Sequence, residues 1–542
     1  MITEDNVKSV LSELNIFKSV GPDRVHPKLL VCLSEDPNFV SALTTLYIKC
    51  YESEKIPNIW KIADITPIHK KGSTTEAKNY RPISLTSILS KLYEKLIRSH
   101  ILEFVSPQIS RQQHGFLQGK SCLSNLLEFM DAVNDLLASG ECVDVFYMDF
   151  QKAFDTVPHY RLIEKLKGYG ITGNVLGVIA DFLSGRLFNV RIGDAHSCTH
   201  PVTSGVPQGS VLGPILFLLY INDLPEVVRN STSLFADDVK MFAPSSTQQT
   251  NQQDIDQMCD WQDRWLLSFN TRDEKCKVMH LGKNNPHNCY YLRDLPLPVV
   301  TSEKDLGVNV DNTLDWTSHI NKCVTKAKSM IYWVTRNVIT RSASVMINLY
   351  KTIIRPHLEY CVQLWAPYPR HGNWSEIMLL EGVQRQFTRL IDGVGLLSYE
   401  ERLKSLELTT LLERRARGDL IETFRIVSGI CNYGQNLFNI SRYGLKLVTK
   451  PNICDNRKYD FFSRRVIGYW NKLPLLVRTA ASVDAFKSRL RSYKHNNIDR
   501  PHQYWELSQE IFSRIDNTNR GSYVKYMREN PYVAKRKGVS TR

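Results

Sequence analysis

The spacing of apolar positions predicts mixed helices and strands up to about residue 311 and helices from there to residue 425. Apolar residues recur every three or four positions in residues 1–50, 87–100 and 255–267, which indicates helices buried on one face. Short apolar runs predict strands at residues 62–68, 143–148, 190–192 and 275–282, and a hairpin at residues 300–311. The sheets are therefore expected in the first part of the chain.

Residues 231–243 predict a hairpin with two acids at its tip. An apolar run reaches Phe235, Asp237 and Asp238 follow, and a second apolar run continues to Ala243. Two adjacent carboxylates repel each other unless a cation neutralises them. A solvated turn also accommodates them, because turns favour Asp, so the local sequence leaves both interpretations open.

A third acid, Asp149, follows the predicted strand at residues 143–148. An acid at the end of a strand, just before a helix, lies where open α/β sheets tend to place their active sites. The alternative role, capping of the helix that Pro158 begins, suits Asp155 better because it lies closer to the helix start.

Two loops carry candidate ligand-binding residues. Residues 69–72 form a basic turn after the predicted strand at 62–68, and residues 79–87 bring the chain back to form a strand pair. Lys70 and Lys71 with Arg81 could present cations across this hairpin to a triphosphate or simply be solvated. Residues 204–213 are rich in Gly and Pro, and this loop could lay its backbone, with Gln208 and Gly209, against a base pair. An ordinary structural loop is the alternative there.

Other segments fit two interpretations each. The loop with Gly115, Gly119 and Lys120 could approach a phosphodiester, although its spacing is not that of a P-loop. The bases at 414, 415 and 417 could line a duplex groove or only solvate a helix. The aromatic and basic residues of 452–542 suit stacking on single-stranded nucleic acid or an ordinary core with a basic rim.

Charge and cysteine content narrow the class of protein. The 542 residues carry a net charge of +14, which suggests a polyanionic partner, nucleic acid first and a membrane surface second. Twelve cysteines without a Cys-x-x-Cys pair argue against a zinc ribbon or disulfide scaffold and fit a reducing compartment. The nearest metal-like cluster, Cys276, His280, His287 and Cys289, does not match a zinc finger. The polar N-terminus predicts no signal peptide, and the apolar run at 211–221 is too short to span a bilayer.

Taken as a set, these residues point to metal-dependent chemistry. Carboxylates from two neighbouring strands, Asp149, Asp237 and Asp238, can hold two divalent cations about 3.5–4 Å apart. One cation would activate a primer 3′-hydroxyl and the other would hold a triphosphate. The expected metal is Mg²⁺, with Mn²⁺ as an alternative, because the ligands are hard oxygens.

Eight motifs in order make the resemblance to a known family specific. They are KSVGPDRVHPKLL, NYRPISLTS, QHGFLQGKSC, DFQKAFDTV, SGVPQGSVLGPILF, FADD, FN with KCKVMHLG, and EKDLGV. Residues 15–490 thereby resemble the polymerase of a non-LTR retrotransposon (LINE) of the jockey or chicken-repeat type, and residues 461–477 and 482–490 resemble the end of such polyproteins.

The resemblance implies an α+β right-hand polymerase with fingers, palm and thumb. The implied parts are an N-terminal helical extension (1–50), a reverse transcriptase domain with fingers and palm (51–311), a helical thumb (312–425) and a basic, aromatic-rich C-terminal region (426–542). Relatives carry an endonuclease ahead of the polymerase. We expect that domain to be absent here, because only a short helical segment precedes the fingers.

The resemblance also implies roles for single residues. The implied metal ligands are Asp149, Asp237, Asp238 and the backbone carbonyl of Phe150. The implied nucleotide-binding residues are Lys70 and Arg81 for the triphosphate, Phe154 as a gate against a 2′-hydroxyl, Gln208 and Gly209 at the nascent base pair, and Lys275 or Lys277 as proton donor to pyrophosphate.

The implied function is that of an RNA-directed DNA polymerase, a nucleotidyltransferase that copies element RNA. Its partners would be an RNA template, a DNA primer or target and dNTPs, with no membrane, in the nucleus or cytoplasm; the sequence does not indicate an oligomeric state. One alternative is a catalytically silent nucleic-acid-binding remnant. A host-domesticated telomerase relative is disfavoured by the segment at 461–490.

Overall fold

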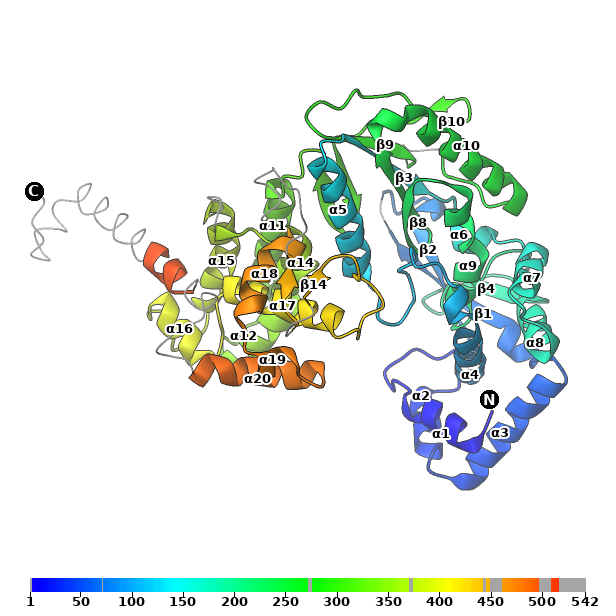
Figure 1. The fold of residues 1–542 in the computed structure, drawn as a ribbon. Helices are drawn as coiled ribbons and strands as arrows, with labels where there is room; N and C mark the ends of the chain where they lie inside the picture. Colours follow the sequence, from blue (N-terminus) through cyan, green and yellow to red (C-terminus); the bar gives the residue numbers. More distant parts are fainter. Residues whose placement is uncertain are drawn as a thin grey trace, which may run out of the picture. The chain divides into compact units, whose positions relative to one another are not determined.

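The computed structural model describes residues 2–70, 72–271, 275–369, 374–441, 445–448, 461–496 and 508–515. The chain divides into two compact units, the first containing residues 1–121, 143–280 and 284–300 and the second residues 122–142, 281–283 and 301–542. Figure 1 follows the chain through both. The boundaries expected after residues 50, 311 and 425 each lie inside one of these units, and the division into fingers, palm and thumb stays a prediction.

Four helices of the first unit lie in the segments where the periodicity predicts helices. They are α1 (Glu4–Ser12), α2 (Pro27–Leu33), α3 (Pro37–Glu52) and α4 (Ile88–Val105). The Ser87 hydroxyl accepts a hydrogen bond from the Ser90 N–H and so caps α4. Helix α1 packs on α3 and α4 through its buried residues Val7 and Leu11.

A five-stranded sheet follows the order β2 (Tyr80–Leu85), β1 (Ile62–His69), β4 (Leu187–Ile192) and β5 (Ala195–His196), with β6 (His200–Pro201) also paired to β4. Strands β1 and β2 are antiparallel, as the sequence predicts, and Ile68 lies opposite Arg81. The turn between them carries Lys70, whose N–H donates to the Asn79 carbonyl over 2.8 Å. The two cations at 70 and 81 thus come from one hairpin.

The second sheet has the order β7 (Ser231–Phe235), β8 (Asp238–Pro244), β3 (Val143–Asp149) and β9 (Lys277–Leu281). Every residue of β3 from Val143 to Met148 is buried, which agrees with its nearly continuous apolar sequence. Strand β8 pairs antiparallel with both β7 and β3. This sheet therefore brings the ends of the β7–β8 hairpin and of β3 together. The combination of helices and sheets confirms the α+β class.

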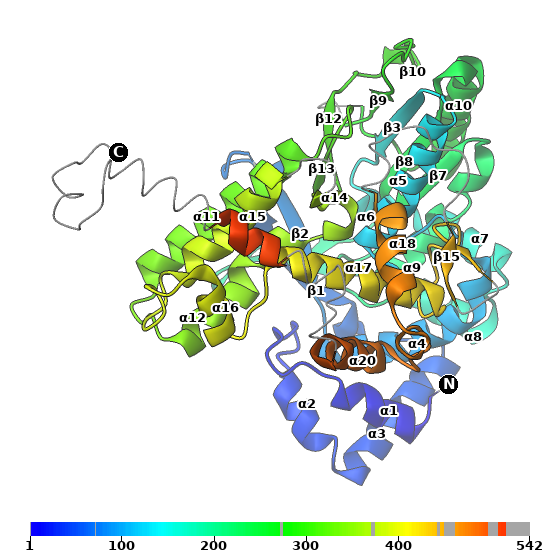
Figure 2. The ribbon, with the colours of Figure 1, turned by 60° about the vertical axis from the view of Figure 1, so that its left-hand side comes forward.

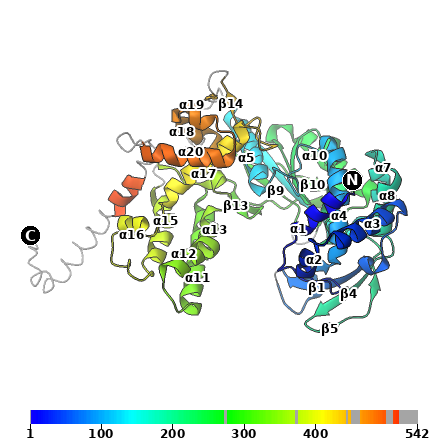
Figure 3. The ribbon, with the colours of Figure 1, turned by 90° about the horizontal axis from the view of Figure 1, so that it is seen from below.

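The remaining helices of the first unit are α6 (Ala153–Thr156), α7 (His159–Gly168), α8 (Gly173–Leu183), α9 (Gly213–Ile221) and α10 (Gln248–Trp265). Helix α7 packs against α8 and α9, and Figure 3 shows α7 and α8 side by side. The buried Lys165 ammonium of α7 lies 2.6 Å from Asp223 and 3.8 Å from the centre of the Trp265 ring. Burial lowers the pKa of Lys165 to about 8. Because α7, α9 and α10 all surround this cation, it ties the three helices together.

The second unit is mostly helical. Its helices are α5 (Cys122–Ala138), α11 (Thr317–Asn337), α12 (Ala343–Leu349), α13 (Pro356–Glu359), α14 (Val362–Trp365), α15 (Trp374–Thr388), α16 (Tyr399–Ser405), α17 (Leu411–Val427), α18 (Phe462–Lys472), α19 (Leu475–Arg478) and α20 (Val483–Asn496). Two-stranded hairpins pair β12 (Ser302–Asp305) with β13 (Val308–Asp311) and β14 (Asn439–Ile440) with β15 (Leu447–Val448); β10 (Tyr291–Leu292) and β11 (Leu295–Pro296) form another in the first unit. Helices α11 and α15 run side by side, as Figure 2 shows.

The core of the second unit resolves two alternatives left open by the sequence. Phe462, Tyr469 and Trp470 of α18 are buried, so these aromatic residues belong to the core. Arg415 is only 3% exposed, which contradicts both surface roles considered for it, and Arg414 pairs with Glu359. The aromatic residues at 459, 504, 505, 523 and 526 of the same region lie outside the described residues.

A buried histidine makes the second unit sensitive to acid. His319 on α11 is 5% exposed, and its Nδ1 accepts a hydrogen bond from the Asn309 N–H over 3.1 Å. Burial, helped by the charge of Lys322, lowers the pKa of His319 from 6.5 to about 4. The unfolded chain therefore takes up the proton first, and stability falls as the pH drops from 6.5 towards 4.

We expect His319→Asn to reduce this acid sensitivity, because the Asn carbonyl can still accept from Asn309 but does not titrate. The pKa shift of His319 corresponds to about 3 kcal/mol of unfolding free energy, fully lost only below pH 4. Urea unfolding followed by circular dichroism at pH 7 and pH 4.5 measures the difference. The same pH dependence in wild type and variant would contradict the assignment.

The part of the chain that the structure describes contains no helix with the length and hydropathy needed to cross a bilayer.

Candidate active site

The tip of the β7–β8 hairpin carries two of the predicted acids. Strand β7 ends at Phe235, Ala236 and Asp237 form the turn, and β8 begins at Asp238. Asp237 is partly buried, whereas Asp238 is exposed. The structure thus agrees with the hairpin that the apolar pattern predicts, and it distinguishes the two adjacent carboxylates by their environments.

Asp149, the last residue of β3, lies opposite Asp238 in the antiparallel pairing. Directly opposed residues of such a pair project from the same face of the sheet, and like charges there are destabilising. Asp149 Oδ2 lies 3.4 Å from Asn270 Nδ2 and 3.3 Å from Lys275 Nζ. Asn270 also donates its backbone N–H to the Asp149 carbonyl over 2.7 Å, which fixes the end of β3.

The electrostatics of Asp237 connect it to residues from three other segments. Burial raises the pKa of Asp237, and the negative charge of Asp149 raises it further. The positive charges of Lys70 and Arg81 act in the opposite direction on the same pKa. The cationic hairpin β1–β2 is therefore within electrostatic range of the acidic hairpin β7–β8, although residues 70 and 237 are far apart in sequence.

The donor set at Asp149 and Asp237 has the chemistry of a divalent-cation site. The charge of Asp149 raises the pKa of Asp237, and a cation bound between the two carboxylates would relieve this repulsion. Among the described residues, however, no group of three or more His, Cys, Asp and Glu side chains is arranged to hold a metal ion. The fit to a metal consequently rests on Asp149 and Asp237, with Asp238 exposed beside them.

The Gly-Pro loop at 204–213 docks on β2. The Ser84 N–H donates to the Gln208 carbonyl over 2.7 Å, and Gly209 adopts φ +120. A Cβ at Gly209 would lie 2.4 Å from the Ser84 carbonyl oxygen, so only glycine fits this approach. The loop therefore brings Gln208 and Gly209 against the same hairpin that carries Arg81.

Asp155 has a different role from the helix cap considered for it. It lies inside α6, and Pro158 occupies the N-cap position of α7. The Asp155 carboxylate accepts a hydrogen bond from Gln208 Nε2 over 3.2 Å, and burial raises its pKa. Asp155 therefore orients Gln208, a contact that the sequence could not indicate because the two residues are 53 positions apart.

Phe154 and Phe150 differ in their surroundings. The Phe154 ring stacks on Phe217 with centroids 4.3 Å apart and meets the edge of Phe116 at 6.1 Å. Phe154 is half-buried, so part of its side chain is left accessible for the predicted contact with a nucleotide. The Phe150 ring is buried against Phe269 at 4.5 Å, so its side chain belongs to the core and only its backbone is left for the predicted metal contact.

Of the two candidate lysines, the structure brings Lys275 to the acids. Its ammonium lies 3.3 Å from Asp149 Oδ2. Lys277 is the first residue of β9, the strand that pairs with β3. Next to Lys275, the Cys276 thiol lies 3.8 Å from the Asp149 carbonyl oxygen. Cys276 is thus part of the surroundings of Asp149.

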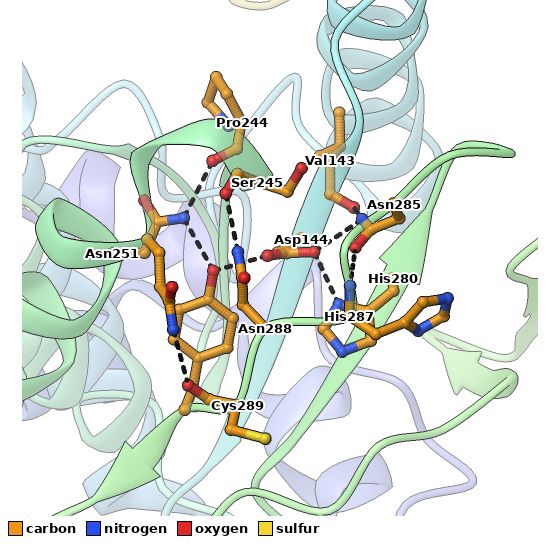
Figure 4. Close-up of polar contacts among 12 residues, drawn as sticks. Val143, Asp144, Pro244, Ser245, Asn251, His280, Asn285, His287, Asn288 and Cys289 are labelled. Carbon is orange, nitrogen blue, oxygen red and sulfur yellow. Dashed lines mark hydrogen bonds and ion pairs between the residues drawn. The ribbon is translucent and has the colours of Figure 1, made fainter.

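The metal-like cluster weighed in the sequence does not assemble. His280 Nδ1 lies 2.7 Å from the buried carboxylate of Asp144, which also accepts from Asn285 and Tyr290. His287 contacts the His280 ring, while the Cys289 thiol lies apart from the two imidazoles in Figure 4. Asp144 and its partners His280, Asn285 and Tyr290 form a polar network at the start of β3, whereas Asp149 lies at the other end of this strand.

Comparison with known proteins shows that part of this chain is similar to reverse transcriptases. Residues 68–327 match the family model described as "Reverse transcriptase (RNA-dependent DNA polymerase)", a range that contains Arg81, Asp149 and Asp237. The "Probable RNA-directed DNA polymerase from transposon X-element" of Drosophila melanogaster is 29% identical over 65% of this chain and 40% of its own length. The "RNA-directed DNA polymerase from mobile element jockey" of the same organism is 28% identical over 71% of this chain and 44% of its own length.

This chain spans less than half the length of these relatives. Among solved structures, apo telomerase from Candida tropicalis, truncated from its C-terminal domain, aligns with 51% of this chain and 59% of that chain at 14% identity. Its TM-score is 0.34, too low to support any inference. The matches to transposon polymerases confirm the resemblance that the sequence motifs indicate.

Proposed function

We propose that this chain, which carries a reverse transcriptase domain of the non-LTR retrotransposon type, is an RNA-directed DNA polymerase that extends a primer 3′-hydroxyl with dNTPs. The observation that carries the proposal is the convergence at Asp237. A partly buried carboxylate there feels the negative charge of Asp149 and the positive charges of Lys70 and Arg81. Acids beside cations are what a metal-bound triphosphate requires.

Each residue of the site has a task in this proposal. Asp149 and Asp237, with Asp238 and the Phe150 carbonyl, would hold two Mg²⁺ or Mn²⁺ ions, which activate the primer hydroxyl and neutralise charge on the triphosphate. Lys70 and Arg81 bind the triphosphate oxygens. We assign proton donation to pyrophosphate to Lys275, because its ammonium lies 3.3 Å from Asp149.

The substrate pocket is completed by residues that select the nucleotide. Phe154, held by its stacking on Phe217, excludes a 2′-hydroxyl from the sugar position. Gln208, oriented by Asp155, and the backbone of Gly209 contact the nascent base pair. In this proposal the protein therefore positions the reactants and stabilises charge on the triphosphate, which are the main requirements of phosphoryl transfer.

Helix α11 supports a nucleic-acid partner. It contains no Asp or Glu, and its exposed residues include Lys326, Lys328 and Arg336. Tyr332 and Trp333 lie on the same helix and are 65% and 49% exposed. Exposed aromatic rings among cations suit stacking and phosphate contacts with nucleic acid. We propose an RNA template and a DNA primer as partners, for a protein acting in the nucleus or cytoplasm.

Arg81→Gln is expected to raise the KM for dTTP about 10- to 100-fold, the effect of one lost charge-assisted hydrogen bond. The measurement is steady-state extension of oligo(dT) on poly(rA) with Mg²⁺. Arg229→Gln, which removes an exposed arginine of the same unit, serves as the matched control and should leave KM unchanged.

An unchanged KM in Arg81→Gln would contradict the triphosphate assignment. A wild-type chain that folds and binds the primer–template but incorporates no nucleotide would overturn the proposed function and favour a silent nucleic-acid-binding remnant.

A further inference from the structure

Asp237 directly follows a residue with an uncommon backbone conformation. Ala236 has φ +55, in the left-handed region that residues with a side chain rarely adopt, and it is 4% exposed. Such a conformation persists when its surroundings hold it in place. The orientation of the Asp237 carboxylate therefore depends on what holds the Ala236 peptide.

Residues 112–115 run beside β7, the strand that leads to this turn. The Leu234 N–H donates to the Gln112 carbonyl over 2.9 Å, and the His114 N–H donates to the Leu234 carbonyl over 2.8 Å. Gln113 and Leu234 form a parallel bridge. Because β7 is the last strand of its sheet, this segment covers the edge of the sheet next to the acidic tip.

The side chain of Gln113 reaches from this segment to the tip itself. It is 2% exposed, and its Oε1 accepts hydrogen bonds from the Ala236 N–H over 2.9 Å and from the Gly115 N–H over 2.7 Å. Its Nε2 has no hydrogen-bond partner among the described residues. One amide oxygen thus satisfies two buried N–H groups, one of them adjacent to Asp237.

Gly115 and Lys120 stabilise the contact between residues 112–115 and the turn at Ala236. A Cβ at Gly115 would lie 2.4 Å from the Ala236 nitrogen, so a larger residue would push the tip away. The Lys120 ammonium donates to the carbonyls of Arg111 and Gln113, the latter over 2.9 Å. Gly115 and Lys120 of the loop at 113–122 therefore support the hairpin, rather than the phosphodiester contact considered from sequence.

We infer that Gln113 is a positioning residue, which fixes the Asp237 carboxylate by holding the Ala236 peptide in its left-handed conformation. The inference rests on the proposed function, since it assigns Asp237 to catalysis. Gln113 itself touches no reacting atom in this account. It acts through two hydrogen bonds to the backbone before Asp237.

Gln113→Met tests the inference by keeping the length of the side chain and removing the acceptor. Amide hydrogen exchange of residues 234–239 in the substrate-free protein is expected to rise about tenfold or more, because the Ala236 N–H loses its partner. The kcat for dTTP incorporation should fall about 10- to 100-fold while the Kd for primer–template stays unchanged. The exchange readout does not depend on activity, so it remains informative even if the proposed function fails.

Gln113→Glu keeps an acceptor and adds a charge. Its second oxygen replaces a nitrogen with no partner among the described residues, so residues 234–239 should exchange as slowly as in wild type. Exchange at residues 234–239 is therefore the readout in this variant, because a retained acceptor should restore the protection of the Ala236 N–H that Gln113→Met loses.

Gln112→Met is the matched control, because it removes a bond to the Thr232 hydroxyl, four residues before the tip. Wild-type exchange and kcat in this variant support the inference. Wild-type exchange at 234–239 in Gln113→Met would overturn it. If Gln113→Met does not fold, Gln113→Glu decides, and exchange at 234–239 well above wild type in the folded Gln113→Glu protein overturns the inference.

Discussion

Asp237→Asn is expected to abolish nucleotide incorporation, by about a thousandfold or more, without lowering the melting temperature. The change keeps the shape of the side chain and removes its negative charge. In the proposed mechanism that charge holds the metal ions, and a neutral amide oxygen is a much weaker ligand for Mg²⁺. Incorporation of dTTP and thermal unfolding of the same preparation measure both halves of the prediction.

The expectation that the melting temperature does not fall follows from the environment of Asp237. Burial and the charge of Asp149 raise the pKa of Asp237 above that of the unfolded chain. The ionised carboxylate therefore weakens the fold at neutral pH, and this cost disappears as the pH falls below the unfolded value of 3.8. Removing the charge should leave the melting temperature at pH 7 unchanged or higher.

Asp194→Asn is the matched control, because Asp194 is an exposed acid of the same unit. It should change neither quantity. If Asp237→Asn unfolds the protein, the acid is structural, and if the variant keeps its activity, the catalytic assignment is wrong.

Phe154→Ala is expected to admit ribonucleotides, lowering the preference for dTTP over UTP about 100-fold. A ring at the sugar position excludes a 2′-hydroxyl by contact, and truncation to a methyl group opens that space. Stacking on Phe217 holds the Phe154 ring in one orientation, which the proposed exclusion requires.

The measurement is the ratio of kcat/KM for dTTP to that for UTP, which is insensitive to a partly unfolded preparation. Tyr160→Ala removes an exposed aromatic residue from α7 and should leave the ratio unchanged. An unchanged ratio in Phe154→Ala would refute the gate assignment.

Local pattern was sufficient for the elements that carry the site. The acids at 237 and 238 lie between two apolar runs, and the β7–β8 hairpin has them at its tip. The β-like run at residues 62–68 and the return at 79–87 similarly correspond to β1 and β2. In both cases strand and turn preferences act over a few residues, which the sequence displays directly.

Interactions between distant segments could not be read in the same way. Gln113 contacts Ala236 across 123 positions, and nothing near residue 113 indicates a polar side chain bound to another turn. Arg415 appears in a basic helical segment but is buried. Burial lowers the pKa of Arg415, and the negative charge of Glu381 acts in the opposite direction. A run of bases does not show which member faces the core, because that depends on acids elsewhere in the chain.

The aromatic residues of α18 illustrate the same limit. Phe462 and Trp470 occur among arginines, a composition that fits both nucleic-acid stacking and a core. Burial decides for the core, since both side chains are fully enclosed, while Arg465 pairs with the buried Asp419 over 2.7 Å. Composition alone cannot distinguish a cation that faces solvent from one that balances a buried acid.

The most direct test of the central claim is primer extension by the full chain on poly(rA)·oligo(dT), with dTTP and Mg²⁺, alongside Asp237→Asn. Binding of the primer–template is measured in the same samples. We expect extension by the wild type that stops when the metal is chelated and is absent from the variant, with equal primer–template binding by both. Binding by a folded wild-type chain without any extension would contradict the claim that this site is a DNA polymerase.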